Sequence, residues 1–322
     1  MNLHMNPYSQ KSTKRFIFTW IFRLASAWFI SAIVFGIYAL IFAWRPLDDY
    51  TPRNSDAVPF LDLILNNAEY GDLMDSHDRP YIVEITASNG GAILLFGAEH
   101  TRDPNDSQLA DIEARWKEFE PSVALCESQL GIFFPGLMDP VRNFAEPGFV
   151  HALAKKHNIP TYTWEPPVKT QIEHLLRDFS KEQVALRFIL NPYFSNLRHG
   201  RPDDADAMVE SVRKKRNLWP GIGGTFPNMQ SLQHAWDKQF PKGPDWRTVS
   251  DQYKMPGFLS KMDANIIRDR HFLTILLDLV EKGERVFAVA GSSHAVKLEP
   301  ALNAAFTPSV APIQTQDGNQ KN

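Results

Sequence analysis

The stretch RVFAVAGSSH at residues 285–294 decides the predicted fold, together with its earlier counterpart AILLFGAEH at residues 92–100. Each begins with a continuous apolar run, which is typical of a strand buried on both faces of a sheet. Each run ends in Gly-x-x-His, which places His100 after one strand and His294 after the other. Ligands of open α/β sheets bind at the carboxyl ends of the strands. We therefore expect two neighbouring strands to bring both imidazoles to one crevice.

Strands and helices alternate around these two stretches. Apolar runs predict further strands at 81–87, 122–126 and 160–164, and helices are expected after Asp106 and after Pro147. The sequence Ser-Asn-Gly-Gly after the first of these strands favours a tight turn, so it should be antiparallel to the next strand. The later strand–helix–strand units are typical of right-handed parallel crossovers. The prediction is an α/β fold with a central mixed β-sheet flanked by helices.

A helical insertion interrupts this alternation. Residues 168–260 are predicted to be mostly helical, around a glycine-rich loop that lacks the Lys-Ser/Thr of a phosphate-binding loop. Such an insertion between two sheet-forming parts covers or gates the crevice in many enzymes. A long amphipathic helix at 262–282 then leads into the strand before His294.

The amino-terminal segment predicts a membrane anchor. Residues 24–43 contain no charged side chain, and a helix of that length spans about 30 Å, the thickness of a bilayer's hydrocarbon core. The basic residues that precede it are Lys11, Lys14, Arg15 and Arg23. A cleaved signal peptide normally has a shorter apolar region of about 7–15 residues, so a retained signal anchor is favoured. By the positive-inside rule, the protein is expected to be single-pass, with a cytoplasmic amino terminus and a periplasmic or extracellular main domain.

The chain is thus divided into successive parts. Residues 1–23 form the cytoplasmic tail, 24–44 the transmembrane anchor and 45–78 a stem. The α/β domain occupies 79–306, and the polar tail 307–322 is expected to be disordered. The formal net charge is −3 with no strong basic field, which argues against a nucleic-acid partner. A single cysteine excludes an intrachain disulfide, and the oligomeric state stays open.

Acidic residues end two of the predicted strands. Glu127 follows the strand at 122–126, and Glu165 follows the strand at 160–164. Parallel strands bring such residues to the same sheet edge. His100, Glu127 and His294 are a sufficient ligand set for a divalent metal that keeps an open position for water. Such a metal lowers the pKa of its water towards about 7 and polarises a carbonyl, with Glu99 or Glu165 as candidate general base.

Two arginines stand near the start of the long helix. Arg268 and Arg270 lie on either side of Asp269, and residues two apart in a helix do not share a face. We expect one of them to pair with a carboxylate near the site and the other to reach solvent. A buried arginine there could stabilise the oxyanion of a tetrahedral intermediate, and an ordinary ion pair is the alternative.

Together these motifs resemble the TraB/GumN/TIKI superfamily, with the erythromycin esterase and ChaN branches as more distant members of the scaffold. The resemblance covers about 80–305 and rests on the two Gly-x-x-His motifs, on Pro-x-x-Ala-Leu-x-Glu-Ser at 121–128, and on Arg268-Asp269-Arg270. It implies an α/β core and metal-dependent hydrolytic, often proteolytic, activity. It also implies roles for His100, His294 and Glu127. The chain departs from the family pattern at Asp269, where Asn is usual, and at Val296, where Gly is common.

The leading hypothesis is a membrane-anchored, extracytoplasmic hydrolase of a peptide or ester substrate. A divalent ion (Mn, Co or Zn) would be held by His100, Glu127 and His294, and the further catalytic candidates are Glu165, Arg268 and Arg270. One alternative is a metal-independent esterase in which His100 acts directly as general base. Another is a non-catalytic ligand- or haem-binding membrane protein on the same scaffold. A serine enzyme is disfavoured because the G-x-S-x-G elbow is absent.

Overall fold

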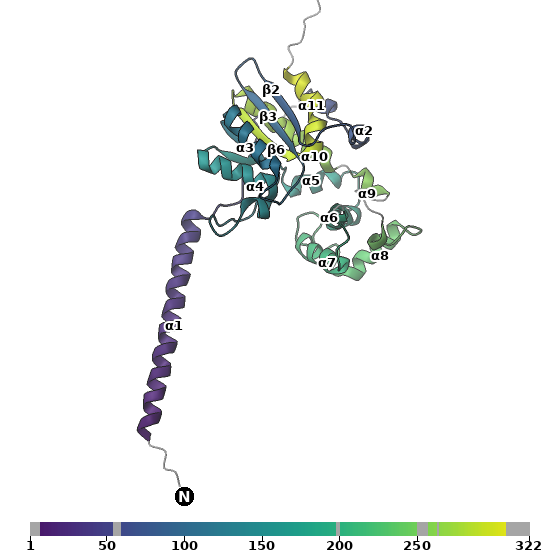
Figure 1. The fold of residues 1–322 in the computed structure, drawn as a ribbon. Coiled ribbons are helices and arrows are strands. Elements are labelled where there is room, and N and C mark those ends of the chain that lie inside the picture. Colours follow the sequence, from purple (N-terminus) through teal and green to yellow (C-terminus); the bar gives the residue numbers. More distant parts are fainter. Residues whose placement is uncertain (1–6, 54–58, 198–199, 250–256, 263, 307–322) are drawn as a thin grey trace, which may run out of the picture.

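A computed structural model describes residues 7–53, 59–197, 200–249, 257–262 and 264–306. A long amino-terminal helix leads into a layered α/β domain, and a lobe of helices lies beside that domain (Figure 1). The tail at 307–322, for which disorder was predicted, lies outside the described residues.

The centre of the α/β domain is a six-stranded mixed sheet with the order β1-β5-β4-β6-β3-β2. Its strands are β1 (Asp48–Asp49), β2 (Tyr81–Thr86), β3 (Ala92–Ala98), β4 (Val123–Cys126), β5 (Thr161–Thr163) and β6 (Arg285–Gly291). β2 is antiparallel to β3, and every other neighbouring pair is parallel. The predicted α/β class, mixed sheet and antiparallel first pair are confirmed. β6 lies between β3 and β4, so the strands that precede both histidines are neighbours.

Helices cover both faces of this sheet. Those on one face are α10 (Ala264–Glu281) and α11 (Ser292–Phe306), and those on the other are α3 (Ser107–Phe119) and α4 (Pro140–His157). Alternate residues of β6 enter the two cores: Val286 packs with Phe272 and Leu298, whereas Phe287 packs with Trp116. This two-sided burial explains why the strand sequence is apolar without alternation.

Two glycines at the strand ends allow a close approach of the segments that carry the histidines. A Cβ on Gly97 would lie 2.7 Å from the carbonyl oxygen of Tyr81 and 3.0 Å from the Cα of Ser292, at the start of α11. A Cβ on Gly291 would lie 2.9 Å from Nε2 of His100. The glycine of each motif is therefore required by packing at the edge of the sheet.

Replacing Gly97 with alanine should destabilise the protein by about 3 kcal/mol, because the new methyl group meets backbone atoms that have no room to move. Thermal unfolding of the full-length protein in detergent measures the change. Gly71→Ala is the matched control, since nothing lies within 4 Å of its added Cβ. The control should unfold at the wild-type temperature or slightly above, and an equal loss in both variants would contradict the packing argument.

The predicted insertion forms a helical lobe with its own core. Its helices are α5 (Val168–Leu175), α6 (Lys181–Asn196), α7 (Ala205–Arg216), α8 (Met229–Gln239) and α9 (Phe258–Lys261). Tyr193, Trp236 and Trp246 are almost fully buried at its centre. Ser180 caps α6, and its side chain accepts a hydrogen bond from the backbone N–H of Gln183. The helical prediction for this segment is thus confirmed over its described residues.

The segment after the amino-terminal helix is part of the domain and not a separate stem. β1 pairs with β5 at the edge of the sheet, and Leu47 and Ile64 are buried. A 3₁₀ turn at Leu61–Leu63 and the helix α2 (Asn67–Leu73) pack near α11. The α/β domain therefore begins at Asp48, whereas the sequence analysis began it at residue 79. A two-residue strand has no recognisable periodicity, so only its partner strand reveals it.

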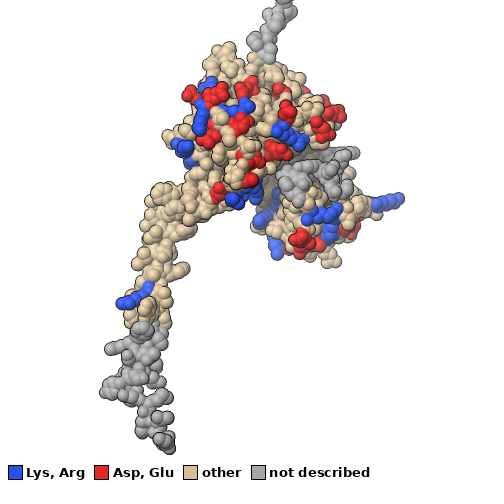
Figure 2. Space-filling view, viewed as in Figure 1, with Lys and Arg blue, Asp and Glu red and all other residues tan. Residues whose placement is uncertain are grey.

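The amino-terminal helix α1 (Pro7–Phe42) projects away from the domain (Figure 1). Within it, Phe18–Phe42 is long and apolar enough to cross a membrane, and none of its most apolar stretch is buried against the rest of the chain. Among residues 18–44, Arg23 is the only charged residue, and the surface of this part of the helix is almost entirely uncharged (Figure 2). An exposed helix of this composition is compatible with membrane association.

Candidate functional site

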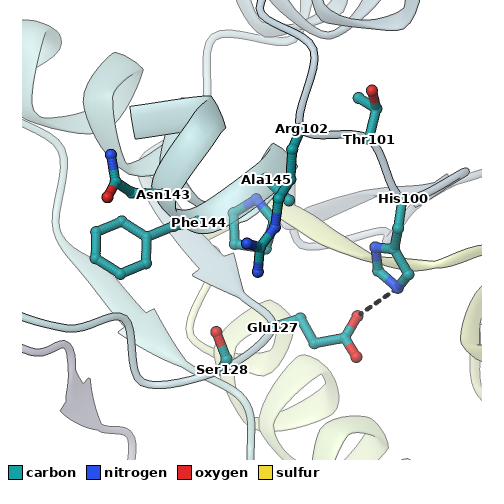
Figure 3. Close-up of a pocket in the computed structure, with 9 residues that line it drawn as sticks. His100, Thr101, Arg102, Glu127, Ser128, Asn143, Phe144 and Ala145 are labelled. Atoms are coloured by element: carbon teal, nitrogen blue, oxygen red, sulfur yellow. Dashed lines mark ion pairs between the residues drawn. The ribbon is translucent and has the colours of Figure 1, made fainter. Parts of the chain in front are cut away.

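The carboxyl ends of β3, β4 and β6 bring His100, Glu127 and His294 together. Nε2 of His100 lies 3.8 Å from Oε2 of Glu127, a pair drawn in Figure 3. Nε2 of His294 lies 4.0 Å from Oε1 of the same carboxylate. Glu127 thus stands between two imidazoles that come from opposite ends of the domain sequence. These are the three residues that the sequence analysis assigned to one site.

The Nδ1 atom of each imidazole contacts a fully buried carboxylate. Nδ1 of His100 lies 3.2 Å from Oε2 of Glu146, and Nδ1 of His294 contacts Oδ1 of Asp269 directly. Because an ionised carboxylate only accepts hydrogen bonds, each Nδ1 must carry the proton. Each Nε2 is consequently turned towards Glu127. This carboxylate–imidazole arrangement is the one that orients histidines which act as ligands or bases.

Glu146 reaches His100 because α4 is broken in front of it. Ala145 has a φ of 55° and a ψ of −149°, which interrupts the helix and turns the next side chain inward. The other oxygen of Glu146 accepts a hydrogen bond from the backbone N–H of Thr101. The sequence analysis missed Glu146, although Pro147 directly after it marks the start of the second half of the helix.

Asp269 joins His294 to a buried lysine. Its second oxygen lies 3.8 Å from Nζ of Lys297, whose side chain is only 2% exposed. Nζ of Lys297 also donates a hydrogen bond of 2.5 Å to the side chain of Asn67. The ring of Trp164 stands edge-on to His294, 5.1 Å between centroids. Asp269 is therefore the residue that holds His294.

Arg268 binds the two acidic residues at the strand ends. Its guanidinium donates to Oε1 of Glu127 at 2.7 Å and to both oxygens of Glu165, at 3.0 and 2.8 Å through Nε. The remaining nitrogen donates to Asn265 at 3.2 Å. Glu127 also accepts a hydrogen bond of 2.8 Å from the backbone N–H of Gly291. All three guanidinium nitrogens are thus engaged, which suits a positioning role better than oxyanion binding.

The charges of the site are strongly coupled. Burial opposes ionisation of Glu127, but the positive charges of Arg268, His294 and His100 outweigh it and lower the pKa of this carboxyl to about 2. Burial also opposes the positive charge of Arg268. The negative charges of Glu165 and Glu127 outweigh burial and raise the pKa of the guanidinium. Glu127 and Arg268 therefore stay charged throughout the physiological range.

Two further candidates lie away from this cluster. Arg270 turns to the other side of α10, where its guanidinium lies 3.5 Å from Asp62 and remains 43% exposed. Glu99 is exposed, and among the described residues its contacts are backbone hydrogen bonds with Gln108. Of the two arginines, one pairs with carboxylates at the site and the other reaches the surface. Glu165 sits in the cluster but is occupied by Arg268.

A pocket of about 490 Å³ opens on the His100 side of the cluster. Glu127, Ser128 and Phe144 line it, whereas His294 is buried behind the carboxylate. Arg102 extends over the same pocket (Figure 3), and it forms no hydrogen bond or ion pair with any residue that the structure describes. The sequence analysis missed this arginine, which follows His100 by two positions. No described residue of 168–260 contributes to the lining.

The donor chemistry of the cluster fits a divalent metal. Two Nε2 atoms with protonated Nδ1 partners and one anionic carboxylate are typical ligands. Among the described residues, no group of three or more His, Cys, Asp and Glu side chains is arranged so that it could hold a metal ion. The distances from the two Nε2 atoms to the oxygens of Glu127 are 3.8 and 4.0 Å. They are about half an ångström longer than the distance of about 3.4 Å between two ligands of a tetrahedral ion.

Comparisons of the chain with models of known protein families, with curated proteins and with solved structures find no match.

Proposed function

We propose that the protein is a membrane-anchored, metal-dependent hydrolase that cleaves a peptide or ester bond in the pocket beside His100. The observation that carries this proposal is the convergence of two imidazoles, each held by a buried carboxylate, on Glu127. The motifs shared with the TraB/GumN/TIKI superfamily support it, and we propose membership of that superfamily. 

The charge balance of the cluster supports a divalent cation. Its carboxylates are Glu127, Glu146, Glu165 and Asp269, and its fixed cations are Arg268 and Lys297. Four negative charges face these two fixed positive ones, and the remaining two are balanced either by protonated His100 and His294 or by a divalent ion. Uncompensated charge in a buried site is strongly unfavourable. A divalent ion held by His100, Glu127 and His294 neutralises the excess.

The residues of the chain then have separate tasks. A divalent ion, if held by His100, Glu127 and His294, would supply a nucleophilic water near neutral pH and polarise the substrate carbonyl. Glu146 and Asp269 keep each histidine in the tautomer that presents Nε2 to the site. Arg268 holds Glu127 in place, and Arg102 is free to donate hydrogen bonds to the oxyanion that forms on the substrate in the pocket.

Chelation is the direct test of this proposal. Full-length protein in detergent is assayed against panels of short peptides and of carboxylic esters, before and after treatment with a chelator. We expect activity to disappear on chelation and to return with Mn²⁺, Co²⁺ or Zn²⁺. His100→Ala should be inactive under all conditions. Hydrolysis by His100→Ala at the wild-type rate would rule the proposed site out.

A metal-independent hydrolase is the second candidate. Nδ1 of His100 is held by Glu146, and its exposed ring borders the pocket, which is the geometry of a histidine general base. This candidate predicts activity that survives chelation and is lost in Glu146→Gln. The same chelation assay therefore separates the two mechanisms.

Arg102 provides a prediction that distinguishes a substrate-contacting arginine from a structural one. Arg102→Ala should lower kcat by about 10²-fold, because one oxyanion donor is removed, while the unfolding temperature stays unchanged. The exposed Arg177 of the helical lobe is the matched control, and Arg177→Ala should keep wild-type kinetics. A wild-type kcat in Arg102→Ala would remove this residue from the mechanism.

We further propose that α1 is a retained anchor with the amino terminus in the cytoplasm and the α/β domain in the periplasm or outside the cell. The excess of basic residues before the apolar span supports this orientation. A reporter enzyme that is active only outside the cytoplasm, fused after residue 322, should be active. Activity only of a cytoplasmic reporter at the same position would contradict the orientation.

A further inference from the structure

We infer that the loop Gln129–Met138, between β4 and α4, enters the lipid bilayer beside α1 and places the pocket at the membrane surface. The inference rests on the proposed anchoring role of α1 and adds a second point of contact with the same bilayer. It identifies a lipid surface as the partner of this loop. It also implies that the substrate is presented at that surface.

The composition of the loop is unsuited to water. The sequence QLGIFFPGLM at 129–138 contains no charged residue. Ile132 is 61% exposed and Leu137 is 68% exposed, so two large apolar side chains project outward within one short loop. Within the described part of the α/β domain, residues 47–53, 59–167 and 264–306, these are the most exposed of the large hydrophobic side chains. Large exposed apolar side chains in one uncharged loop are typical of contact with a membrane or a partner.

The loop is attached to the apolar helix itself. Phe134 lies against Phe35 and Tyr38, with ring centroids 5.6 and 6.4 Å apart, and the Tyr38 hydroxyl donates a hydrogen bond to the carbonyl of Pro135. Backbone hydrogen bonds of 2.8 and 3.1 Å join Trp44 and Phe133 in both directions. The loop therefore runs alongside α1 and its position along the helix is defined.

That position lies within the expected thickness of the bilayer. Charged residues limit the apolar segment at Arg23 and Arg45. The residues between them span about 30 Å as a helix, which equals the hydrocarbon core. Tyr38 and Phe35 lie about 6 and about 10 Å below the helix end at Phe42, at 1.5 Å per residue. The part of the loop that touches them is thus level with the outer part of the hydrocarbon layer.

The loop also forms the support of the pocket. Glu127 and Ser128, which line the pocket, directly precede it in the chain. Phe133 of the loop packs on Phe144, a further lining residue, with 6.0 Å between ring centroids. A loop that is seated in lipid therefore fixes the pocket close to the bilayer surface. Substrates that carry their cleavable bond at that surface are the class that can reach it.

Depth-resolved fluorescence quenching in vesicles tests the inference with the full-length chain. Cys126 is completely buried, so single cysteines introduced by Ile132→Cys and Leu137→Cys can be labelled selectively with an environment-sensitive dye. Leu218→Cys, at a position 82% exposed in the helical lobe, is the water control. Ile30→Cys on α1 is the membrane control. The quenchers are phosphatidylcholines with a nitroxide at a shallow or a deep position of the acyl chain.

We expect the dyes at 132 and 137 to be quenched by the shallow nitroxide at least about threefold more strongly than the dye at 218. The dye at 30 should respond most to the deep nitroxide. If the dye at position 30 is quenched while the dyes at 132 and 137 behave like the dye at 218, the loop inference is overturned and the anchor proposal stands. If 30 also escapes quenching, the anchor proposal is overturned and the loop inference falls with it. The exposed position of both loop side chains makes folding insensitive to their replacement, and thermal unfolding of each variant confirms it.

Discussion

Glu127→Gln should reduce hydrolysis by on the order of 10³-fold, the largest loss of activity expected from any conservative substitution in the chain. The amide keeps the shape of the side chain but removes the only negative charge that faces both Nε2 atoms. It also places an NH₂ group where Arg268 or the Gly291 N–H now donates. Steady-state kinetics of the full-length protein on the substrate found in the panel assay measure the change.

Glu99→Gln is the matched control for that substitution. Glu99 lies next to His100 in the sequence, but it is exposed, and among the described residues its contacts are backbone hydrogen bonds with Gln108. We expect wild-type kinetics within about twofold, because surface substitutions away from a site have small effects. If the two variants lost activity equally, the loss in Glu127→Gln would not be specific to the carboxylate between the two imidazoles.

Arg268→Met should cause the largest loss of stability, about 3–5 kcal/mol in the free energy of unfolding. The substitution leaves Glu127 and Glu165 as unpaired carboxylates with side chains only 17% and 16% exposed. Arg270→Met on the same helix is the control, since its ion pair with Asp62 is solvent-exposed and should contribute less than about 1 kcal/mol. Thermal unfolding of both variants in detergent provides the comparison. Equal losses of unfolding free energy in the two variants would show that the ion pairs of Arg268 with Glu127 and Glu165 stabilise the protein no more than the exposed pair does.

The pH dependence of the Arg268 variant follows from the same ion pairs. In the wild type the pKa of Glu127 is lowered to about 2, so its contribution to stability is complete above about pH 4.5 and is lost as the pH falls towards 2. Without Arg268, the pKa of Glu127 rises because burial is no longer offset. The unfolding temperatures of variant and wild type should therefore converge as the pH falls from 7 to 4. A constant difference across that range would contradict this explanation.

The sheet was predictable because its strands carry local signals. The apolar runs before Gly97 and Gly291 are long enough to mark two-sided burial, and Asn89-Gly90 marks the turn between β2 and β3. The helices of the insertion follow from periodicity and from the cap at Ser180. β1 was missed because its two residues carry no pattern of their own.

The residues that support the site could not be predicted, because their burial depends on contacts between distant segments. Lys297 looks like an ordinary surface lysine of α11, and it is buried only through Asp269 and Asn67. Glu146 precedes a proline and turns inward only because α4 breaks at Ala145. In contrast, His100 and His294 share a motif, and sequence comparison within the chain is enough to pair them.

A cobalt titration of the full-length protein in detergent tests metal binding by His100, Glu127 and His294 directly. Co²⁺ bound by nitrogen and oxygen ligands has a visible absorption spectrum that does not depend on activity. We expect one Co²⁺ per chain, with the spectrum lost in both His100→Ala and His294→Ala and retained in Arg270→Met. Absence of binding by the wild-type protein, or an unchanged spectrum in both histidine variants, would contradict it.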